Sequence, residues 1–536
     1  MLSGKCSISD HHLREASEQM ITQLIFQWAK QTPERTAVIY NGKAWSYRSF
    51  ARAIAVARGY FARRGYLGPG YAVLAVSNRM NFWIISLALR SLGLTTVSVG
   101  NQAILRQLAG RGLTNVRCVI NTPGEIKPTP ESYQNYQRLW GNLHGLCTEL
   151  GLNLLSVSPA GDETALPLER SEALHQLGGH ILLTSGTTGM FKMVLMSPET
   201  DADILRLHVE LFGIDQHSLL CVFDFGTWTG GGYKWAACPW TVGGATLMED
   251  GDEPHWALLR PGITHAITSP AGLARILAAP ADAFPRNDTM QLAVGSGAMT
   301  RTQVEQAKAR ITSRLFHYFV STEGGIMAFT SLDTPEDQRW HRLVPGRMVE
   351  IVDASDRPVP IGEVGQVRVD TAGGPTGYLN DETATRTFFR GGFFYSGDLA
   401  VMRSDGRIAL QGRITDVINM QGIKISPAPI EERLGEVLGL NGVCLFSIQN
   451  DSGEEELHVV LETPKPIDSE RLIAAIKKEL PGLFYGARVH CLATLPRNHM
   501  GKVLRQEVRA QVMPTAAINP NGAQLRANAA PLRLSR

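Results

Sequence analysis

Residues 184–192 read TSGTTGMFK and place four hydroxyl side chains, two glycines and a lysine within nine residues. Glycines let a backbone approach a ligand closely, while hydroxyl and amide groups donate hydrogen bonds to oxyanions. The segment therefore predicts a phosphate-binding loop. It is not a Walker A loop, because its glycines are two residues too close together and no hydroxyl residue follows Lys192.

Short apolar runs alternate with helical patterns before residue 350, and the run HILL, residues 180–183, predicts a buried strand that leads into this loop. Strands that alternate with helices favour α/β layers with mostly parallel sheets. The runs that predict strands are YAVLAVS, VRCVINT, HILLTSG, LLCVFDF, GATLMED, THAITSP and MQLAVGSG, and those that predict helices include NFWIISLALRSLG and AGLARILAA.

From Val349 the pattern changes to antiparallel strands joined by turns, as in VEIVDASDRPVPIGEVGQVRVDT. After residue 422 the order helix, strand, strand, helix predicts a small α+β unit. We expect an α/β protein whose large N-terminal domain, residues 1–412, combines α/β layers with a β-rich subdomain. A small mobile α+β domain, residues 413–512, and a disordered tail, residues 513–536, would follow.

The composition argues against several classes of function. A net charge of +2 provides no basic field for nucleic acid or for an anionic membrane. Seven scattered cysteines without a CxxC pair favour a reduced chain with no structural zinc. The polar N-terminus shows no signal peptide, and the most apolar stretch, residues 82–94, carries Arg90 and is too short to span a bilayer. We expect a soluble, cytoplasmic protein.

Four further segments carry residues that could bind a nucleotide. They are YFVSTEGG (318–325), YSGDL (395–399), QGRITDVINMQGIKISP (411–427) and PRNHMGKVLR (496–505). Together with TSGTTGMFK they resemble, in order and spacing, the core motifs of the adenylate-forming superfamily. That superfamily includes acyl-CoA synthetases, luciferases and the adenylation domains of nonribosomal peptide synthesis. The resemblance covers roughly Thr22 to Arg505 and implies an enzyme that uses ATP and Mg²⁺.

The resemblance implies how ATP is held. The loop 184–192 would close over the β- and γ-phosphates, and Phe319 would stack on adenine. Asp398 would accept hydrogen bonds from both ribose hydroxyls, with Arg413 beside it. The implied ATP-binding residues are Thr184, Ser185, Gly186, Thr187, Thr188, Gly189, Lys192, Phe319, Asp398 and Arg413.

The same resemblance implies three catalytic residues. Thr322 would touch the α-phosphate, and Glu323 would hold Mg²⁺, a hard cation that prefers carboxylate and phosphate oxygens. Lys502 would bridge the substrate carboxylate and the α-phosphate, where negative charge develops during attack. The chain departs from the family pattern at Phe191, Met193 and Val320, where proline, glycine and glycine are usual. Because the charged groups are intact, we expect an active enzyme.

The segment LLCVFDFGTWTGGGYKW bears on the substrate. Its Phe223-Asp224 pair resembles that of amino-acid-activating adenylation domains, whose aspartate pairs with the substrate α-ammonium. A carboxylate in an apolar pocket is costly unless a cation meets it, so Asp224 favours an amino acid. Phe225 and Tyr318 stand where domains that accept large side chains usually have small residues. A pocket filled from within predicts glycine, with alanine next, because exclusion is the workable route to glycine selectivity. The predicted substrate-binding residues are Asp224, Phe225, Trp228, Gly295, Tyr318 and Met327.

Transfer to a thiol is the second half of the implied reaction. Only 34 residues follow Lys502, and none has the serine context of a fused carrier domain, so we expect a carrier protein that acts in trans. The superfamily moves its C-terminal domain about a hinge in GRITD, here at Thr415 or Asp416. Similar free-standing enzymes supply peptide pathways or decorate the cell envelope, for example with glycine on lipid A.

Two alternatives remain open from the sequence. An acyl- or aryl-CoA ligase would have no need of Asp224, so replacing that residue would spare its activity. A non-catalytic nucleotide-binding homologue would bind ATP without releasing pyrophosphate and would be indifferent to Lys502→Ala.

Overall fold

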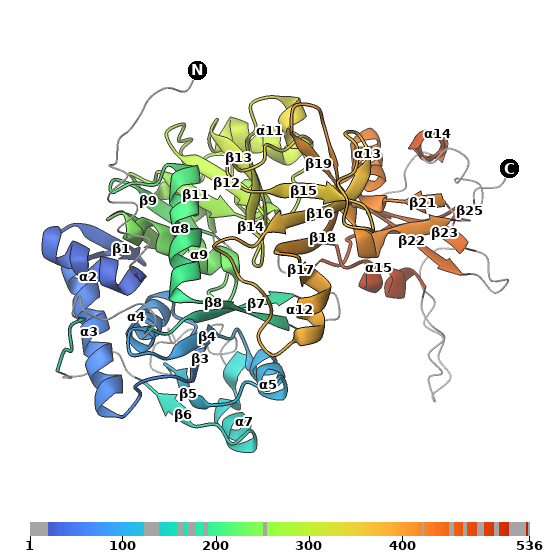
Figure 1. Cartoon of the computed structure of the whole chain (residues 1–536). Helices are drawn as coiled ribbons and strands as arrows, with labels where there is room; N and C mark the ends of the chain where they lie inside the picture. Colours follow the sequence, from blue (N-terminus) through green and yellow to red (C-terminus); the bar gives the residue numbers. More distant parts are fainter. Residues whose placement is uncertain are drawn as a thin grey trace.

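The structure of the chain is a computed structural model, shown in Figure 1. The structure describes residues 20–122, 139–157, 164–168, 177–185, 191–223, 225–249, 254–420, 423–449, 455–464, 469–479, 487–497, 503–513 and 532–533.

The first of two large sheets lies at the bottom of Figure 1 and has the order β6-β5-β3-β4-β7-β8. Its strands are β3 (Tyr71–Ala75), β4 (Thr95–Ser98), β5 (Val116–Asn121), β6 (Leu154–Ser156), β7 (His180–Ser185) and β8 (Phe191–Met196). Neighbouring strands are parallel except for β7 and β8, which form an antiparallel pair. The outer face packs against α5 (Gln102–Gly110) and α7 (Leu143–Glu149).

The second sheet has the order β14-β13-β12-β11-β9-β10-β1-β2. Its strands are β1 (Thr36–Tyr40), β2 (Lys43–Ser46), β9 (Leu219–Val222), β10 (Ala245–Met248), β11 (His265–Thr268), β12 (Gln291–Gly295), β13 (Leu315–Ser321) and β14 (Gly325–Ser331). The inner strands are parallel, and the antiparallel pairs β1–β2 and β13–β14 form the two edges. Its outer face is covered by η3 (Pro254–Leu259), α10 (Pro270–Ala278) and α11 (Arg301–Arg310).

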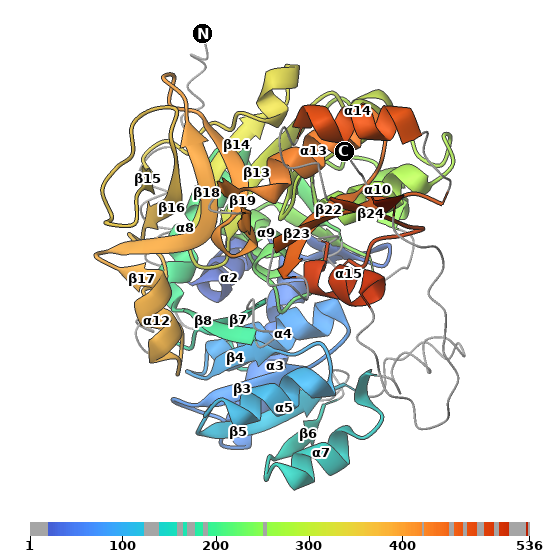
Figure 2. The ribbon, with the colours of Figure 1, turned by 90° about the vertical axis from the view of Figure 1, so that its right-hand side faces the viewer.

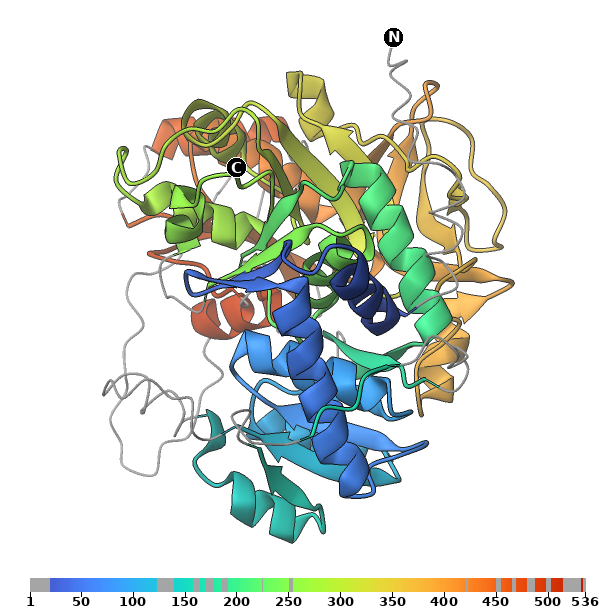
Figure 3. The ribbon, with the colours of Figure 1, turned by 90° about the vertical axis from the view of Figure 1, so that its left-hand side faces the viewer.

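One hydrophobic cluster fills the space between the two sheets. It is built with the helices α2 (Ile21–Gln31), α3 (Tyr47–Arg63), α4 (Arg79–Arg90), α8 (Pro198–Phe212) and α9 (Gly230–Thr241). Figure 3 shows α2 in dark blue, α3 in blue and α8 in green on one side of the molecule.

Local sequence sets the bounds of these helices. For α8, the Ser197 hydroxyl accepts a hydrogen bond from the Thr200 amide, Pro198 is the first helical residue, and Gly213 ends the helix with a φ of 63°.

An antiparallel sheet follows, with the path β15-β16-β18-β17 and β19 paired to β18. Its elements are β15 (Val349–Val352), β16 (Val364–Asp370), β17 (Phe389–Arg390), β18 (Phe393–Met402) and β19 (Ile408–Arg413), with η4 (Pro335–Gln338) before it and α12 (Glu382–Phe388) beside it. This sheet contacts the end of the second sheet where β13 turns into β14, because Val369 and Phe394 pack around Gly324.

The C-terminal unit faces the viewer in Figure 2. It begins with η5 (Ile414–Asp416), β20 (Ile418–Met420) and β21 (Ile423–Ile425), followed by the sheet β22 (Val443–Gln449), β23 (Glu455–Glu462), β24 (Arg488–Leu492) and β25 (Leu532–Arg533). The helices α13 (Pro427–Leu438) and α14 (Ser469–Glu479) pack on one face of this sheet, and α15 (Arg505–Val512) packs on the other.

The predicted fold class is confirmed: α/β layers come first, then antiparallel strands, then a small α+β unit. The predicted phosphate loop lies between the antiparallel strands β7 and β8. One feature departs from the expectation: Leu532 and Arg533 of the predicted disordered tail pair with β24. Tail residues 514–531 and 534–536 lie outside the described residues. None of the helices in the described residues has the length and apolar character needed to cross a membrane.

Candidate active site

The turn between β13 and β14 contains Thr322 and Glu323. Glu323 is 9% exposed, and its Oε1 accepts two hydrogen bonds. The Tyr378 hydroxyl donates at 2.8 Å, and the Thr184 hydroxyl donates at 3.2 Å. Three segments that are far apart in the sequence therefore meet at one carboxylate.

Lys192 lies on the other arm of the β7–β8 hairpin, directly opposite Thr184. Its Nζ is 3.7 Å from the centre of the Phe388 ring and 4.9 Å from that of Tyr378, which is cation–π distance. Partial burial lowers the pKa of Lys192, and the negative charge of Glu323 opposes that shift. The predicted loop residues Gly186, Thr187, Thr188 and Gly189, and the side chain of Ser185, lie outside the described residues.

Asp398 and Arg413 face each other across β18 and β19, with 3.2 Å between an Asp398 oxygen and the Arg413 Nε. The carboxylate is the more buried partner, since its side chain is 16% exposed and that of Arg413 is 40% exposed. Three causes lower the pKa of Lys192: burial is the largest, and the positive charges of Arg111 and Arg413 follow. The Asp398–Arg413 pair therefore lies close enough to Lys192 to act on it electrostatically. Phe319 is half-buried on β13, three residues before Thr322.

Arg347 ties the turn to the antiparallel sheet. Its guanidinium donates to the carbonyl oxygen of Gly324 at 2.8 Å and to that of Asp370 at 3.0 Å. The backbone directly after Glu323 is thereby held against the end of β16.

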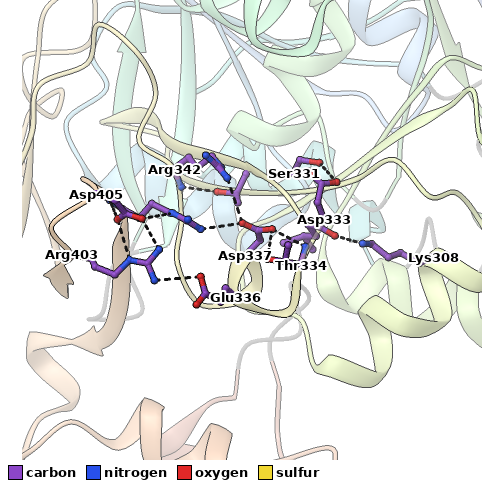
Figure 4. A network of polar contacts seen from close by, with 12 residues as sticks. Lys308, Ser331, Asp333, Thr334, Glu336, Asp337, Arg342, Arg403 and Asp405 are labelled. Atoms are coloured by element: carbon purple, nitrogen blue, oxygen red, sulfur yellow. Dashed lines mark hydrogen bonds and ion pairs between the residues drawn. The ribbon is translucent and has the colours of Figure 1, made fainter. Parts of the chain in front are cut away.

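The polar network in Figure 4 is a second tie between the two sheets. Asp337 of η4 is buried and accepts hydrogen bonds from the Thr334 amide and hydroxyl, both at 2.8 Å. Arg407 joins this carboxylate at 3.3 Å to Asp405, which lies in the β18–β19 turn, at 2.9 Å. The network therefore joins the segment after β14 to the turn between β18 and β19, the strands that carry the Asp398 ion pair.

Thr322 lies against the first turn of α9. A β-carbon at Gly230 would lie only 3.2 Å from the Thr322 hydroxyl oxygen, so the glycine makes room for that side chain. Four residues further along the helix, the Lys234 Nζ donates a hydrogen bond to the Thr322 carbonyl oxygen at 3.1 Å. Helix α9 therefore contacts both the side chain and the backbone of Thr322.

Large side chains fill the predicted substrate pocket. Tyr318 and Gly295 are direct neighbours on β13 and β12, and the tyrosine ring covers the glycine so closely that a β-carbon there would overlap it. Tyr318 is 2% exposed, and its ring centre is 5.7 Å from that of Trp235 on α9. Phe225 is 3% exposed and covers Gly231 in the same way.

Two more predicted pocket residues lie in the described chain. The Trp228 ring covers Gly226, and the Trp228 carbonyl accepts a hydrogen bond from the Leu183 amide at 3.2 Å, on the strand that leads to the phosphate loop. Met327 is fully buried on β14. Asp224, the predicted partner of the substrate ammonium, lies outside the described residues.

The predicted hinge residues lie in η5, where the Thr415 hydroxyl donates to an Asp416 carboxylate oxygen at 3.3 Å. Just before them, Gly412 of β19 packs closely against Ala428 of α13. The hinge segment therefore lies at the point where the antiparallel sheet meets the C-terminal unit. Lys502 lies outside the described residues.

The described residues hold no group of three or more His, Cys, Asp or Glu side chains that could bind a metal ion without a substrate. A Mg²⁺ that is bound by one or two carboxylates and by substrate phosphates does not need such a group. Glu323 fits that arrangement, because both of its hydrogen bonds from described residues fall on Oε1 and leave Oε2 for a cation.

Comparison with known proteins decides the family. The family model described as AMP-binding enzyme matches residues 25–379. The chain belongs to the AMP-binding enzyme family. Its relatives include a triostin synthetase and a plipastatin synthase protein.

The relatives of this AMP-binding enzyme carry names that describe different substrates or products. A salicylyl-CoA synthase / salicylate adenylyltransferase from Streptomyces sp is 26% identical over 348 residues, which are 61% of this chain and 62% of the relative. Triostin synthetase I from Streptomyces triostinicus is 28% identical over 385 residues, 67% and 69% of the two chains. One of the plipastatin synthase proteins of Bacillus subtilis is 26% identical over 463 residues, 77% of this chain but 17% of the relative. The matches thus span less than two thirds of the salicylyl relative and less than a fifth of the plipastatin synthase protein.

Solved structures share the fold. An amide bond synthetase from Marinactinospora thermotolerans has a TM-score of 0.75 at 20% identity and covers 92% of this chain and 99% of its own. An o-succinylbenzoate CoA synthetase from Bacillus subtilis has a TM-score of 0.75 at 18% identity and covers 92% and 98%. Both support a large N-terminal domain followed by a smaller C-terminal domain.

Tyr378 and Lys234 are among the residues of the site that the sequence reasoning missed. Tyr378 lies in the stretch GYLN, and no sequence pattern around it indicates that it contacts Glu323. Lys234 did leave a signal, since it is the only charged residue in the helix sequence GGGYKWAACPWT. A lysine surrounded by apolar residues on a buried helix is unusual enough to ask what it binds.

Proposed function

We propose that this AMP-binding enzyme activates a small amino acid, glycine first and alanine next, as the aminoacyl-AMP. It then passes the aminoacyl group to the phosphopantetheine thiol of a separate carrier protein. The observation that carries the proposal is the buried Tyr318 ring packed over Gly295, with Phe225 packed over Gly231. Forcing extra methylenes into a close-packed site costs about 1–3 kcal/mol, so a substrate with little or no side chain is favoured.

Asp224 gives the amino-acid class in this proposal. Its sequence neighbours Phe223 and Phe225 are apolar residues that are 4% and 3% exposed. A carboxylate in an apolar pocket needs a cation, and the α-ammonium of an amino acid would supply one.

The first step forms the adenylate. A carboxylate oxygen of the amino acid attacks the α-phosphorus of ATP, the bond between the α-phosphorus and the bridging oxygen breaks, and pyrophosphate leaves. Asp398 orients the ribose, Thr322 contacts the α-phosphate, and Lys502 bridges the two reacting groups. Glu323 would hold Mg²⁺, which would supply positive charge to the phosphates. These residues contribute position and charge rather than covalent bonds.

The second step forms the thioester. A thiolate attacks the carbonyl carbon of the adenylate, and AMP leaves with the oxygen that the carboxylate contributed. In this proposal the C-terminal domain, residues 413–512, turns about Thr415 or Asp416 between the two steps and withdraws Lys502. Similarity to triostin synthetase I and to a plipastatin synthase protein supports a carrier protein as the acceptor.

An aryl acid is the second candidate substrate. It is favoured by the similarity to a protein that is named as a salicylyl-CoA synthase and salicylate adenylyltransferase. An aryl ring would need the space around Gly295, which the Tyr318 ring occupies.

The test is ATP–pyrophosphate exchange with a panel of acids: the twenty amino acids, D-alanine, β-alanine, benzoate, salicylate and short fatty acids. Strong exchange with glycine, weaker exchange with alanine, and loss of both in Asp224→Ala are the expected results. Exchange only with acids that lack an amino group would overturn the amino-acid assignment and favour a CoA ligase.

A further inference from the structure

Lys234 of α9 is a buried lysine that the proposed chemistry does not use. It is 2% exposed, and its hydrogen bond to the Thr322 carbonyl oxygen measures 3.1 Å. Within the described residues no carboxylate forms an ion pair with it. Asp201 acts on it only at longer range and is already bound by Arg90 at 2.9 Å and by the Tyr233 hydroxyl at 2.7 Å.

Packing alone does not call for a lysine at this place. Taking an ammonium out of water without a counter-ion of its own is costly, and a methionine of similar length would fill the space without that cost. Burial also lowers the pKa of Lys234 to about 8. The one polar group that benefits from this ammonium through a hydrogen bond, among the residues that the structure describes, is the Thr322 carbonyl.

The position of that carbonyl is what matters. It belongs to the peptide that links Thr322 to Glu323, so its orientation sets the directions in which both side chains leave the backbone. Gly230, on the first turn of the same helix, receives the Thr322 side chain. Helix α9 thus holds this peptide from two points, and Lys234 supplies the polar one.

We propose that Lys234 is a positioning residue for adenylate formation: its ammonium holds the Thr322–Glu323 peptide in the orientation that presents both side chains to ATP. The inference rests on the proposed roles of Thr322 and Glu323 and is independent of which acid the enzyme activates.

The proposal predicts a pH dependence. The groups that face Lys234 are Asp201 and His208 of α8, Cys238 of α9, Glu323 of the turn, and Arg347. Burial lowers the pKa of His208 to about 3 and raises that of Cys238 well above its usual value, so neither changes charge near pH 8. Lys234 is charged below about pH 8 and loses its proton as the pH rises. Activity that depends on the ammonium therefore falls above that pH.

The test compares Lys234→Met with Lys308→Met. Lys308, labelled in Figure 4, makes the same kind of bond from α11 to the Leu332 carbonyl. Leu332 follows β14, whereas Glu323 precedes it, and within the described residues Lys308 forms no bond with Asp337 or Arg407. Steady-state ATP–pyrophosphate exchange is measured from about pH 6.5 to about pH 9.5 with whichever acid the wild type activates, together with the unfolding temperature. For Lys234→Met we expect kcat/KM for ATP to fall about 10- to 100-fold, the loss expected for a hydrogen bond from a charged group. Its decline above pH 8 should disappear, and its unfolding temperature should equal or exceed that of the wild type. Lys308→Met should stay within about twofold of the wild type, the range of an ordinary surface change.

Activity of Lys234→Met within threefold of Lys308→Met would overturn the proposal, and so would a loss of activity with the alkaline decline intact. Should Lys234→Met fail to fold, Lys234→Gln, which keeps a donor without the charge, gives the same two readouts. If the wild type shows no ATP–pyrophosphate exchange with any acid, the proposed function is refuted instead. In that case calorimetry of Mg-ATP binding decides the role of Lys234: binding at least tenfold weaker in Lys234→Met supports it, and equal binding overturns it.

Discussion

Removing the hydroxyl of Tyr378 tests whether the Glu323 carboxylate must be held in place. The hydroxyl donates to Glu323 Oε1 at 2.8 Å, and the Thr184 bond at 3.2 Å is the other one that the described residues supply. The Tyr378→Phe variant keeps the ring beneath Lys192, where the Nζ lies 4.9 Å from its centre, and deletes only the donor. A hydrogen bond to a charged group contributes about 1.5–3 kcal/mol. At about 1.4 kcal/mol per factor of ten, kcat/KM for ATP should fall roughly 10- to 150-fold.

The assay is ATP–pyrophosphate exchange at varied ATP and at saturating acid. The matched control is Tyr47→Phe, which deletes another buried hydroxyl, whose hydrogen bond of 2.7 Å goes to the Gly244 carbonyl, outside the site. KM for the acid should change by less than about twofold in both variants, since neither hydroxyl contacts the predicted pocket. Equal activity of Tyr378→Phe and Tyr47→Phe would refute the reasoning.

Three further changes follow from the structure. Asp398→Asn removes the charge that pairs with Arg413 at 3.2 Å and should raise KM for ATP about 10- to 100-fold in the exchange assay; an unchanged KM would remove Asp398 from the ribose site. Tyr318→Ala empties the space over Gly295, so exchange with leucine or phenylalanine should appear. The unfolding temperature should fall, because truncating a buried aromatic side chain costs about 3–5 kcal/mol. Continued selectivity for glycine would mean that other residues exclude larger side chains. Asp337→Asn weakens the network of Figure 4 by about 1–3 kcal/mol and should lower the unfolding temperature. It should also raise KM for ATP but not KM for the acid. A normal KM for ATP would mean that the network is not needed to align the two halves of the site.

The buried parallel strands were readable because strands covered on both faces are continuous apolar runs. YAVLAV became β3 and LLCV became β9 for this reason. Which strands pair was not readable, because pairing depends on contacts between distant segments. Thus β1, at residues 36–40, pairs with β10, at residues 245–248. The edge strand β8 was missed, since its residues FKMVLM follow a loop that was interpreted by its ligand chemistry alone.

Some residues of the candidate site could likewise be predicted from the sequence, and others could not. Thr184, Glu323 and Asp398 stand in motifs whose spacing identified them, and the structure brings Thr184 and Glu323 together. Tyr378 reaches Glu323 only because the chain folds back after β16, and no local pattern encodes that contact. Lys234 was encoded by its isolation among apolar residues, but its partner is a backbone carbonyl, which a sequence does not reveal.

The central claim, that an amino-acid carboxylate attacks the α-phosphorus of ATP, is tested most directly by following oxygen-18. The wild-type enzyme is incubated with ATP, Mg²⁺ and glycine labelled in both carboxylate oxygens, with hydroxylamine as the acceptor, and AMP is analysed by mass spectrometry. The account predicts one labelled oxygen in each AMP, none in pyrophosphate, and loss of labelling in Lys502→Ala. Unlabelled AMP, or labelling from benzoate and salicylate but not from glycine, would contradict it.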